Sequence, residues 1–435
     1  MKTVAFHTLG CKVNTYESEA MLKLFANDGY KEVEFKEQAD VYVINTCTVT
    51  NTGDSKSRQM IRKAYRNNPQ AVICVVGCYS QVASAEIASI EGVSVVLGTQ
   101  FRSEIVELVK QYQSSQKQII KIADVMRSPR FEDLDIDEFT KNTRAFLKIQ
   151  DGCNNFCTYC IIPYARGKMR SRDKESVLSQ AQSLVNHGFS EIVLTGIHTA
   201  GYGQDFEDYS FYDLLVDLTT KVKGLKRLRI SSIEMSQVSE EIINLIADSK
   251  IIVDHLHIPI QSGNDNTLKR MNRHYTTKQF EDKYFELKKK LPSLSVTTDV
   301  IVGFPGESDE DFESTYNWIK KLHFNQLHVF PYSKRKGTPA ARMKDQVDEK
   351  IKKQRVKSLL DLSHELMKDY ALQQFNQVLE VLIEEQEGDY MIGHASNYLK
   401  VKVKLPLSSV GHIYKVLIKD IDDVILIGEM LSEED

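Results

Sequence analysis

The sequence has no apolar run long enough to cross a membrane, which takes about 20 residues. The opening residues, Met1 to His7, lead to Gly10 and Cys11 rather than to a cleavable signal. The formal net charge is −4, so any contact with RNA must come from local basic patches. These absences predict a cytosolic protein with no membrane partner, in which thiols stay reduced and available to metal.

Three of the seven cysteines stand at Cys-x3-Cys-x2-Cys spacing, namely Cys153, Cys157 and Cys160. A loop of this size can fold around one cubane iron–sulfur cluster. Four irons normally take four thiolates, so three ligands leave one iron open. Zinc would need a fourth protein ligand, and the next histidine, His187, lies beyond a basic loop and a helix-like stretch. A disulfide fits poorly with an intracellular chain. We interpret the triad as an open cluster site.

Three other cysteines, Cys11, Cys47 and Cys78, follow or close short apolar runs at 4–9, 41–45 and 72–77. Each run predicts a buried strand followed by a helix, which is the pattern of a parallel sheet. Loops at the carboxyl ends of parallel strands meet at one edge, so the three cysteines can converge on a second open cluster. Separate buried cysteines are the alternative. Cys74 would lie about 13 Å down its strand from Cys78 and is interpreted as a small buried apolar residue.

The middle of the chain contains six strand-like runs separated by segments of helix length, at 145–150, 192–195, 228–231, 255–260, 296–302 and 326–330. Repeated strand–helix units predict a parallel sheet with right-handed crossovers, here a partial barrel. In such barrels the chemistry lies at the carboxyl ends of the strands. The cysteine triad follows the first predicted strand, as this rule requires.

Towards the C-terminus, apolar residues recur at helical spacing: Leu359, Leu362, Leu366 and Tyr370. They predict a connecting helix with one apolar face. From Val378 onward the period is strand-like and predicts a small all-β module. A polar stretch with Pro129 indicates a linker. The predicted units are an α/β domain (1–113), a linker (114–143), the partial barrel (144–347), the connecting helix (348–375) and the all-β module (376–435).

Four segments resemble the methylthiotransferase family of radical S-adenosylmethionine (SAM) enzymes: TLGCKVN (8–14), NTCTVT (45–50), VGCY (76–79) and CIIPYARG (160–167). The resemblance covers nearly the whole chain. It implies an N-terminal methylthiotransferase domain, a radical SAM partial (β/α)6 barrel and a C-terminal TRAM domain. It also implies a tRNA methylthiotransferase that acts on N6-threonylcarbamoyladenosine beside the anticodon.

The same resemblance implies two [4Fe-4S] clusters and SAM as cofactors. It assigns the radical cluster to Cys153, Cys157 and Cys160. It assigns an auxiliary cluster, which holds sulfur, to Cys11, Cys47 and Cys78. Reductive cleavage of SAM is implied to yield the radical that takes the hydrogen from C2 of adenine. A flavodoxin- or ferredoxin-like electron donor and a sulfur source are the implied partners besides tRNA.

Residues that follow successive barrel strands are predicted to contact SAM: Thr195, Gly196, Ser232, Glu234, Gln261, Gly303 and Glu307. A simple turn is the alternative for the segment at Gly303. After the cluster loop, a group of arginines is predicted to bind phosphate or the carboxylate of the threonylcarbamoyl group: Arg166, Arg170 and Arg172. Lys400 and Lys402 are predicted to contact tRNA phosphates, with protection of an edge strand as the alternative.

Three other functions stay open at this point. The chain resembles enzymes that modify isopentenyladenosine in tRNA or an aspartate of a ribosomal protein. An isopentenyl group needs a hydrophobic pocket, whereas a threonylcarbamoyl group needs a cation and hydrogen-bond donors, which the basic loop after the triad favours. A non-catalytic iron–sulfur carrier or redox protein is the third alternative, and cleavage of SAM to 5′-deoxyadenosine distinguishes an enzyme from it.

Overall fold

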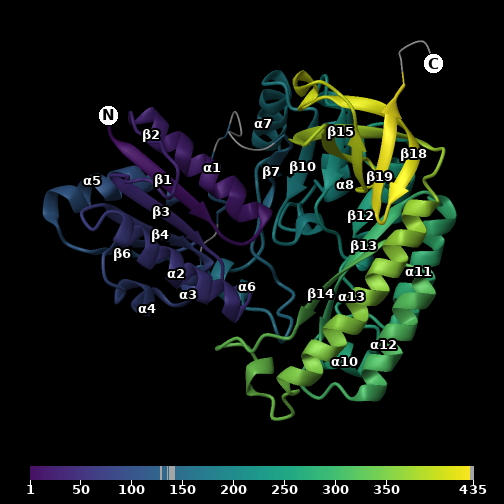
Figure 1. Ribbon diagram of the computed structural model, residues 1–435. Helices are drawn as coiled ribbons and strands as arrows, with labels where there is room; N and C mark the ends of the chain where they lie inside the picture. The colour runs from purple at the N-terminus through teal and green to yellow at the C-terminus, as the bar shows by residue number, and fades with distance from the viewer. Residues whose placement is uncertain (128–129, 135, 137–142, 432–435) are drawn as a thin grey trace.

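The structure is a computed structural model that describes residues 1–127, 130–134, 136 and 143–431. It contains an N-terminal α/β layer, a curved α/β unit in the middle and a C-terminal β-barrel (Figure 1). Pro129 of the predicted linker lies outside the described residues. Among the described residues, no helix is both long and apolar enough to cross a membrane.

The N-terminal unit is built on one parallel sheet of six strands in the order β2-β1-β3-β4-β5-β6. The strands are β1 (Thr3–Thr8), β2 (Lys31–Glu32), β3 (Val41–Thr46), β4 (Val72–Gly77), β5 (Val93–Leu97) and β6 (Ile119–Lys121). The helices are α1 (Lys12–Asn27), α2 (Asn51–Asn67), α3 (Cys78–Val82), α4 (Ser84–Ala88), η1 (Arg102–Glu104) and α5 (Ile105–Ser115). Strands β3 and β4 are buried along their whole length because helices cover both faces of the sheet.

The sheet contains the three strands predicted to precede or carry Cys11, Cys47 and Cys78. Cys74 is fully buried in the core on one face, as predicted. Strand β6 lies inside the segment 114–143, which the sequence analysis assigns to a linker, so the sheet extends past residue 113.

The middle unit contains all six predicted strands: β7 (Ala145–Lys148), β10 (Glu191–Thr195), β11 (Arg227–Ile230), β12 (His255–His257), β13 (Ser295–Val302) and β14 (Gln326–Pro331). They form two parallel sheets, β11-β10-β7 and β12-β13-β14, which the bridge between Leu228 and Ile252 and the hydrogen bond from the Ile233 amide to the His257 carbonyl connect. Shorter strands are β8 (Gln150–Asp151) and β9 (Arg170–Ser171). This arrangement confirms the predicted partial barrel.

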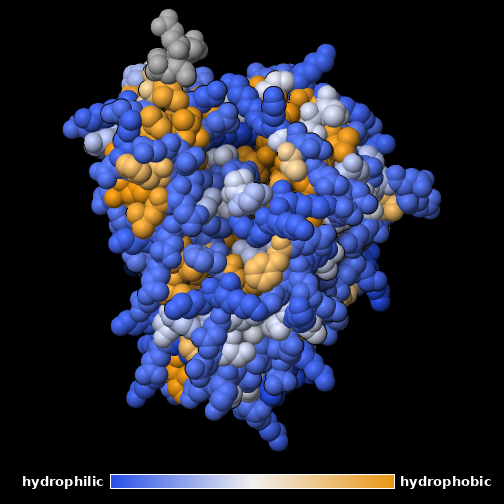
Figure 2. Space-filling model, turned by 90° about the vertical axis from the view of Figure 1, so that its right-hand side faces the viewer, coloured by the Kyte–Doolittle hydropathy of each residue, from blue (hydrophilic) through white to orange (hydrophobic). Residues whose placement is uncertain are grey.

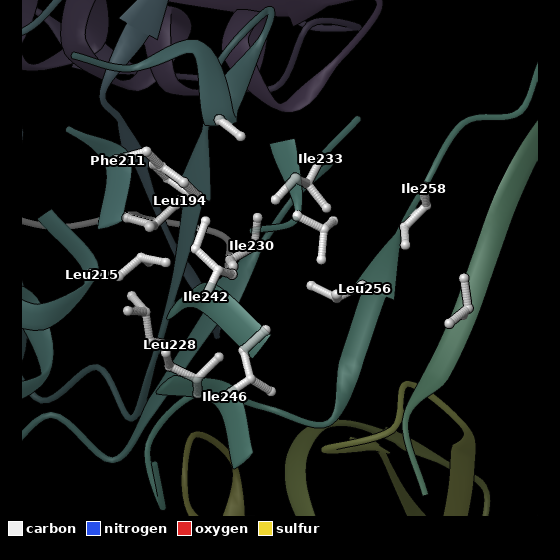
Figure 3. Packing of buried hydrophobic residues seen from close by; sticks show 14 of the residues in the cluster. Leu194, Phe211, Leu215, Leu228, Ile230, Ile233, Ile242, Ile246, Leu256 and Ile258 are labelled. Carbon is white, nitrogen blue, oxygen red and sulfur yellow. The ribbon is translucent and has the colours of Figure 1, made fainter. Parts of the chain in front are cut away.

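Helices α7 (Lys174–Asn186), α8 (Phe211–Lys221), α9 (Glu240–Asp248), α11 (Thr277–Lys290) and α12 (Asp309–Leu322) pack on the strands of the partial barrel. The loops carry α6 (Ile162–Arg166), η2 (Thr199–Gly201), η3 (Met235–Gln237), α10 (Asp265–Arg270) and η4 (Ala340–Arg342). Capping boxes begin α8, α11 and α12 and satisfy the free amides of the first turn. In Figure 3, Leu194, Leu228 and Leu256 of the strands pack near Leu215, Ile242 and Ile246 of the helices. This core holds the strand ends in place.

The C-terminal part begins with α13 (Glu349–Leu372), whose predicted apolar face is buried. The strands that follow are β15 (Val378–Glu387), β16 (Tyr390–Ala395), β17 (Lys400–Val403), β18 (Ile413–Asp422) and β19 (Ile425–Met430), with η5 (Leu407–Ser409) between β17 and β18. They close into a barrel in the order β15-β16-β17-β19-β18. The predicted all-β module is therefore confirmed.

The surface seen in Figure 2 is mainly hydrophilic, and its apolar residues form separate patches rather than one continuous band. Strand β17, which carries Lys400 and Lys402, pairs with β16 on one side and β19 on the other. It is not an edge strand, so edge protection as an explanation of these lysines is wrong.

Candidate active site

A cavity of about 790 Å³ lies where the three units meet. The N-terminal unit contributes Cys11 and Lys12, and the turn between β16 and β17 contributes Tyr398. The cysteine triad, Cys153, Cys157 and Cys160, forms another part of the wall. Residues on or just after β10 to β14 complete the cavity. The cavity therefore extends from the carboxyl ends of the barrel strands, where the fold predicts the site, into the interior of the barrel.

The triad lies in the loop between β8 and α6, which backbone contacts hold in place. The Cys153 amide donates to the carbonyl of Gly167 at 3.1 Å, and the Cys160 amide donates to the carbonyl of Cys157 at 2.9 Å. Gly152 has φ +77°, and a Cβ atom there would lie 2.0 Å from the carbonyl oxygen of Lys168. Only glycine fits this close approach. These contacts define the shape of the loop.

The thiols of the triad are suited to a positively charged inorganic group. Burial raises the pKa of Cys153 to about 11 and that of Cys160 to about 12. These thiols stay protonated near neutral pH unless a bound cation stabilises the thiolates. All seven cysteines are free. Three neighbouring free thiols at the edge of a cavity fit a cluster with three protein ligands.

The structure also brings Cys11, Cys47 and Cys78 together at the carboxyl edge of the N-terminal sheet. A Cβ atom on Gly10 would lie 3.1 Å from Cys47 Sγ, so the loop of Cys11 packs directly on Cys47. The Cys78 thiol interacts electrostatically with both other thiols, and burial raises its pKa to about 12. This second set of thiols has the same chemical character as the first.

Among the described residues, no three His, Cys, Asp or Glu side chains are arranged to hold a single metal ion. A cubane needs a wider arrangement, because its thiolates surround four irons rather than one.

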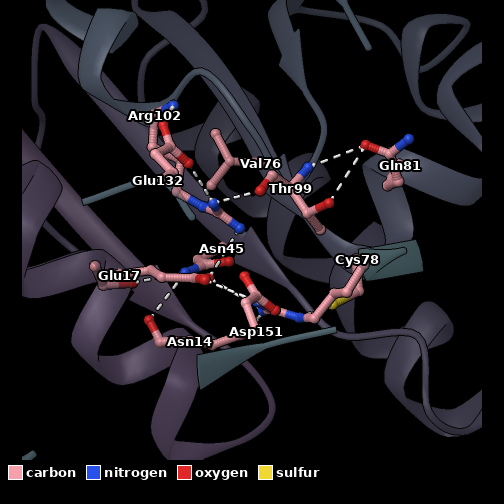
Figure 4. A network of polar contacts seen from close by, with 12 residues as sticks. Asn14, Glu17, Asn45, Val76, Cys78, Gln81, Thr99, Arg102, Glu132 and Asp151 are labelled. Atoms are coloured by element: carbon pink, nitrogen blue, oxygen red, sulfur yellow. Dashed lines mark hydrogen bonds and ion pairs between the residues drawn. The ribbon is translucent and has the colours of Figure 1, made fainter. Parts of the chain in front are cut away.

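A buried polar network includes Glu17, Arg102 and Asp151 (Figure 4), and hydrogen bonds of Arg166 connect it to Cys78. The Arg166 Nε donates to Cys78 Sγ at 3.2 Å, and its Nη1 donates to Glu17 Oε1 at 2.8 Å. Asp151 accepts from the same guanidinium at 3.1 Å. Burial alone would raise the pKa of Glu17, but the cations of Arg102 and Arg166 lower it to about 2. The network joins the N-terminal unit to the partial barrel.

This network corrects the predicted role of the basic loop. Arg166 is fully buried, and Arg170 is 3% exposed and donates to the carbonyl of Arg166. Arg172 is also fully buried and pairs with Asp133 at 2.6 Å. The prediction that Arg166, Arg170 and Arg172 bind the substrate is wrong, because protein groups enclose all three side chains.

Five of the seven predicted SAM contacts line the cavity: Thr195, Gly196, Ser232, Glu234 and Gln261. Gly303 and Glu307 are not part of this wall. The Glu307 carboxylate instead accepts from the Gly303 amide at 2.8 Å and pairs with Arg355 of α13 at 2.6 Å. These two residues connect a barrel loop to α13, and the structure contradicts a direct role for the Glu307 side chain.

Several residues of the cavity had no signal in the sequence. Arg273, after α10, donates from Nη1 to Glu234 Oε1 at 2.9 Å and lies 3.8 Å from Cys157 Sγ. Gln237 bonds His198 Nε2 at 2.7 Å. The nearness of Arg273 to the triad depends on how the fourth barrel strand and α10 are placed. Such a contact has no short-range spacing by which it could be recognised.

Lys400 and Lys402 lie on the C-terminal barrel outside the cavity and are partly exposed. Both approach Glu387, at 3.7 and 3.5 Å. Their contact with tRNA stays a prediction.

Comparisons with known proteins agree with this architecture. A model of the radical SAM superfamily matches residues 147–319, and one of the "Uncharacterized protein family UPF0004" matches residues 3–98. The chain is 56% identical to the threonylcarbamoyladenosine tRNA methylthiotransferase MtaB of Bacillus subtilis (strain 168), over 96% of this chain and 94% of that protein.

A protein of the same name from Aquifex aeolicus is 38% identical, over 95% of this chain and 100% of that protein. The tRNA-2-methylthio-N(6)-dimethylallyladenosine synthase of Finegoldia magna is 33% identical, over 99% and 95% of the two chains. The solved radical SAM methyltransferase TsrM from Kitasatospora setae has a similar fold, with a TM-score of 0.57 at 14% identity over 78% of this chain and 77% of that one.

Proposed function

Because the chain belongs to the radical SAM methylthiotransferase family, we propose that it converts N6-threonylcarbamoyladenosine in tRNA to the 2-methylthio derivative. One observation carries this proposal: Cys11 and the cysteine triad line the same cavity. A methylthio transfer needs a site that activates the substrate and a site that delivers sulfur. The triad and Cys11, which belongs to the second set of thiols, border one cavity and so meet this need. The name carried by the relative at 56% identity supports the choice of substrate.

Membership of the radical SAM family brings a [4Fe-4S] cluster and SAM, and the residues that would hold this cluster are Cys153, Cys157 and Cys160. When bound, they supply the one-electron chemistry needed to remove a hydrogen that no side chain is basic enough to take as a proton. A second cluster, on Cys11, Cys47 and Cys78, belongs to the proposal. Its support is the convergence of these three thiols, of which Cys11 is exposed, Cys47 is partly buried and Cys78 is buried.

In this proposal the side chains of the protein bind SAM and orient the groups around the thiols. Thr195, Ser232 and Gln261 offer polar groups to SAM along one wall of the cavity. Arg273 fixes the Glu234 carboxylate near Cys157. Arg166 donates a hydrogen bond to Cys78, which favours the thiolate form that a metal requires.

The proposed partners follow from the reaction. tRNA is the substrate, and its phosphates are the proposed ligands of Lys400 and Lys402. A flavodoxin- or ferredoxin-like protein is the proposed electron donor, and a separate sulfur source is needed for repeated turnover. A tRNA substrate and reduced thiols place the proposed reaction in the cytoplasm.

The experiment is mass spectrometry of nucleosides from tRNA incubated with reconstituted protein, SAM and a strong reductant. Two tRNA preparations are compared, one bearing threonylcarbamoyladenosine and one bearing isopentenyladenosine. The proposal predicts a methylthio gain on the first nucleoside alone. A gain on the second alone would overturn the choice of substrate. No gain on either, while SAM is still cleaved, would overturn the proposed tRNA reaction.

A further inference from the structure

One charged side chain in the wall of the cavity has no ion-pair partner. The charged residues that line the cavity are Lys12, Arg229, Glu234, Arg273 and Asp299. Three of them are in ion pairs, Arg273 with Glu234 and Arg229 with Glu191 at 2.7 Å, and Asp299 lies 3.3 Å from the ring of His257. Among the residues that the structure describes, Lys12 forms no ion pair. Of the Lys and Arg side chains described in this wall, Lys12 is thus the one without a carboxylate partner in the protein.

The surroundings of Lys12 make an anion favourable there. Lys12 is the first residue of α1, directly after Cys11, and is only partly exposed. Two guanidinium groups, those of Arg144 and Arg229, lie within electrostatic reach of its ammonium group, as do the side chains of Tyr398 and Cys11. Like charges and loss of water both disfavour a lone cation. A carboxylate entering the cavity would relieve both effects.

A second feature of the same wall also indicates a ligand. His255 is 4% exposed, its Nε2 lies 3.1 Å from Thr297 Oγ1, and its ring stacks on Tyr398. Its other ring nitrogen, Nδ1, is buried without a hydrogen-bond partner within the described chain. Burial holds the pKa of His255 well below its ordinary value, so the ring is neutral. A neutral ring with one free nitrogen can bond a polar group of a ligand.

We propose that Lys12 binds the free carboxylate of the threonylcarbamoyl group and that His255 bonds a polar atom of the same substituent. This inference rests on the proposed function, because it specifies how that substrate is recognised. A dimethylallyl group has no carboxylate and would leave Lys12 unpaired, so the same residue selects against it. Lys12 takes the role that the sequence suggested for the basic loop after the triad, which is buried.

The experiment uses anticodon stem-loop RNA that carries threonylcarbamoyladenosine or its carboxamide analogue, in which a neutral amide replaces the carboxylate. The reconstituted wild type is compared with Lys12→Met, Lys12→Arg and Lys36→Met. Lys36 is an exposed lysine of the N-terminal unit and serves as the matched control. Both kcat/KM for methylthiolation and the Kd of each RNA are measured, the latter without SAM or reductant. Iron content is determined for every variant.

For Lys12→Met we expect kcat/KM on the carboxylate RNA to fall at least about 30-fold, because a desolvated charge loses its partner. On the carboxamide RNA the variant and the wild type should agree within about twofold, since no charge pair exists there to lose. The Kd of the carboxylate RNA divided by the Kd of the carboxamide RNA should also be higher for Lys12→Met than for the wild type. Lys12→Arg should recover most of the loss, and Lys36→Met should match the wild type.

Two results would overturn the inference. Lys12→Met could discriminate between the RNAs as the wild type does. Alternatively, it could lose activity equally on both RNAs together with iron, which would mean that Lys12 serves the neighbouring thiols instead. Failure of the proposed function looks different: the wild type, with full iron and active SAM cleavage, would modify neither RNA. The Kd ratio would then still decide whether Lys12 recognises the carboxylate.

Discussion

The two cysteine sites reach the same cavity by different routes. The triad lies in one loop, where a few backbone bonds and a required glycine at 152 set its shape. Cys11, Cys47 and Cys78 come from three loops, which the order of β1, β3 and β4 brings to one edge. The first site depends on local chain geometry, whereas the second depends on the assembled sheet. A substitution far from the second site can therefore disturb it more easily.

The sites also differ in what stabilises their thiols. Near the triad, Arg273 approaches Cys157 from the barrel wall and is itself paired with Glu234. Near the second site, Arg166 bonds Cys78 from within a fully buried network that spans two structural units. The second site is thus coupled to the contact between the N-terminal unit and the barrel. The following predictions separate the two sites.

The largest effect is expected for the triad. Cys157→Ala should abolish both SAM cleavage and methylthiolation, because the radical site loses a ligand. Liquid chromatography of 5′-deoxyadenosine, together with iron analysis, measures this loss. Cys74→Ala is the matched control, since Cys74 is a core residue that contacts neither site, and it should keep both activities. SAM cleavage at the wild-type rate by Cys157→Ala would contradict the assignment of the radical site.

A large effect on stability is expected for Arg166→Met. The substitution removes one of the two cations that contact both Glu17 and Asp151, while Arg102 and Lys148 remain paired with them, so the free energy of unfolding should fall by about 3 kcal/mol. Arg58, on α2, pairs with Glu86 at the surface, so Arg58→Met should change the free energy of unfolding by less than about 1 kcal/mol. Urea unfolding measures both variants. Equal effects would contradict a special role of the buried network.

The same network predicts a dependence of stability on pH in the metal-free protein. The pKa of Glu17 is lowered from 4.5 to about 2, so its ionised form stabilises the folded state above the unfolded value. This contribution is lost as the pH falls from about 4.5 towards 2. Glu17→Gln should be less stable than the wild type at neutral pH but should lose less stability across that acid range. Parallel curves for the two proteins would contradict the prediction.

The smallest effect is expected on the C-terminal barrel, outside both cysteine sites. Replacing Lys400 and Lys402 together by glutamine should weaken tRNA binding several-fold and reduce its salt dependence, by up to about one phosphate contact for each lysine. Filter binding over a range of salt concentrations measures this change, with Lys36→Gln as the control. An unchanged dependence of binding on salt would mean that the two lysines pair with Glu387 and do not contact tRNA phosphates.

Much of the fold could be predicted from the sequence, because the signals were local. Each barrel strand is a short apolar run between helix-length segments, and the triad shows its spacing directly. Strand β6 was missed because its three residues lie in a polar stretch and gain their order only by pairing with β5. The edge-strand explanation of Lys400 failed for a similar reason, since only the closed barrel shows that β17 has two neighbours.

The roles of site residues were less predictable where they depend on contacts between distant parts of the sequence. Arg166 looked like an anion-binding residue beside the cluster loop, but its partner Glu17 lies 149 residues away in the chain. No spacing in the sequence shows that these two residues are buried together. Lys12 was likewise unremarkable beside Cys11, because its lack of a partner becomes visible only inside the cavity.

The claim that two separate thiol sites serve one cavity is tested most directly with Cys47→Ala, by measuring 5′-deoxyadenosine and methylthiolated nucleoside in the same reaction. Cys47 belongs to the second site alone, so SAM cleavage should continue at close to the wild-type rate while no methylthiolated product forms. Loss of both activities in a folded variant that retains iron at the triad would contradict two separable sites. Formation of product by this variant would contradict the sulfur-delivering role of the second site.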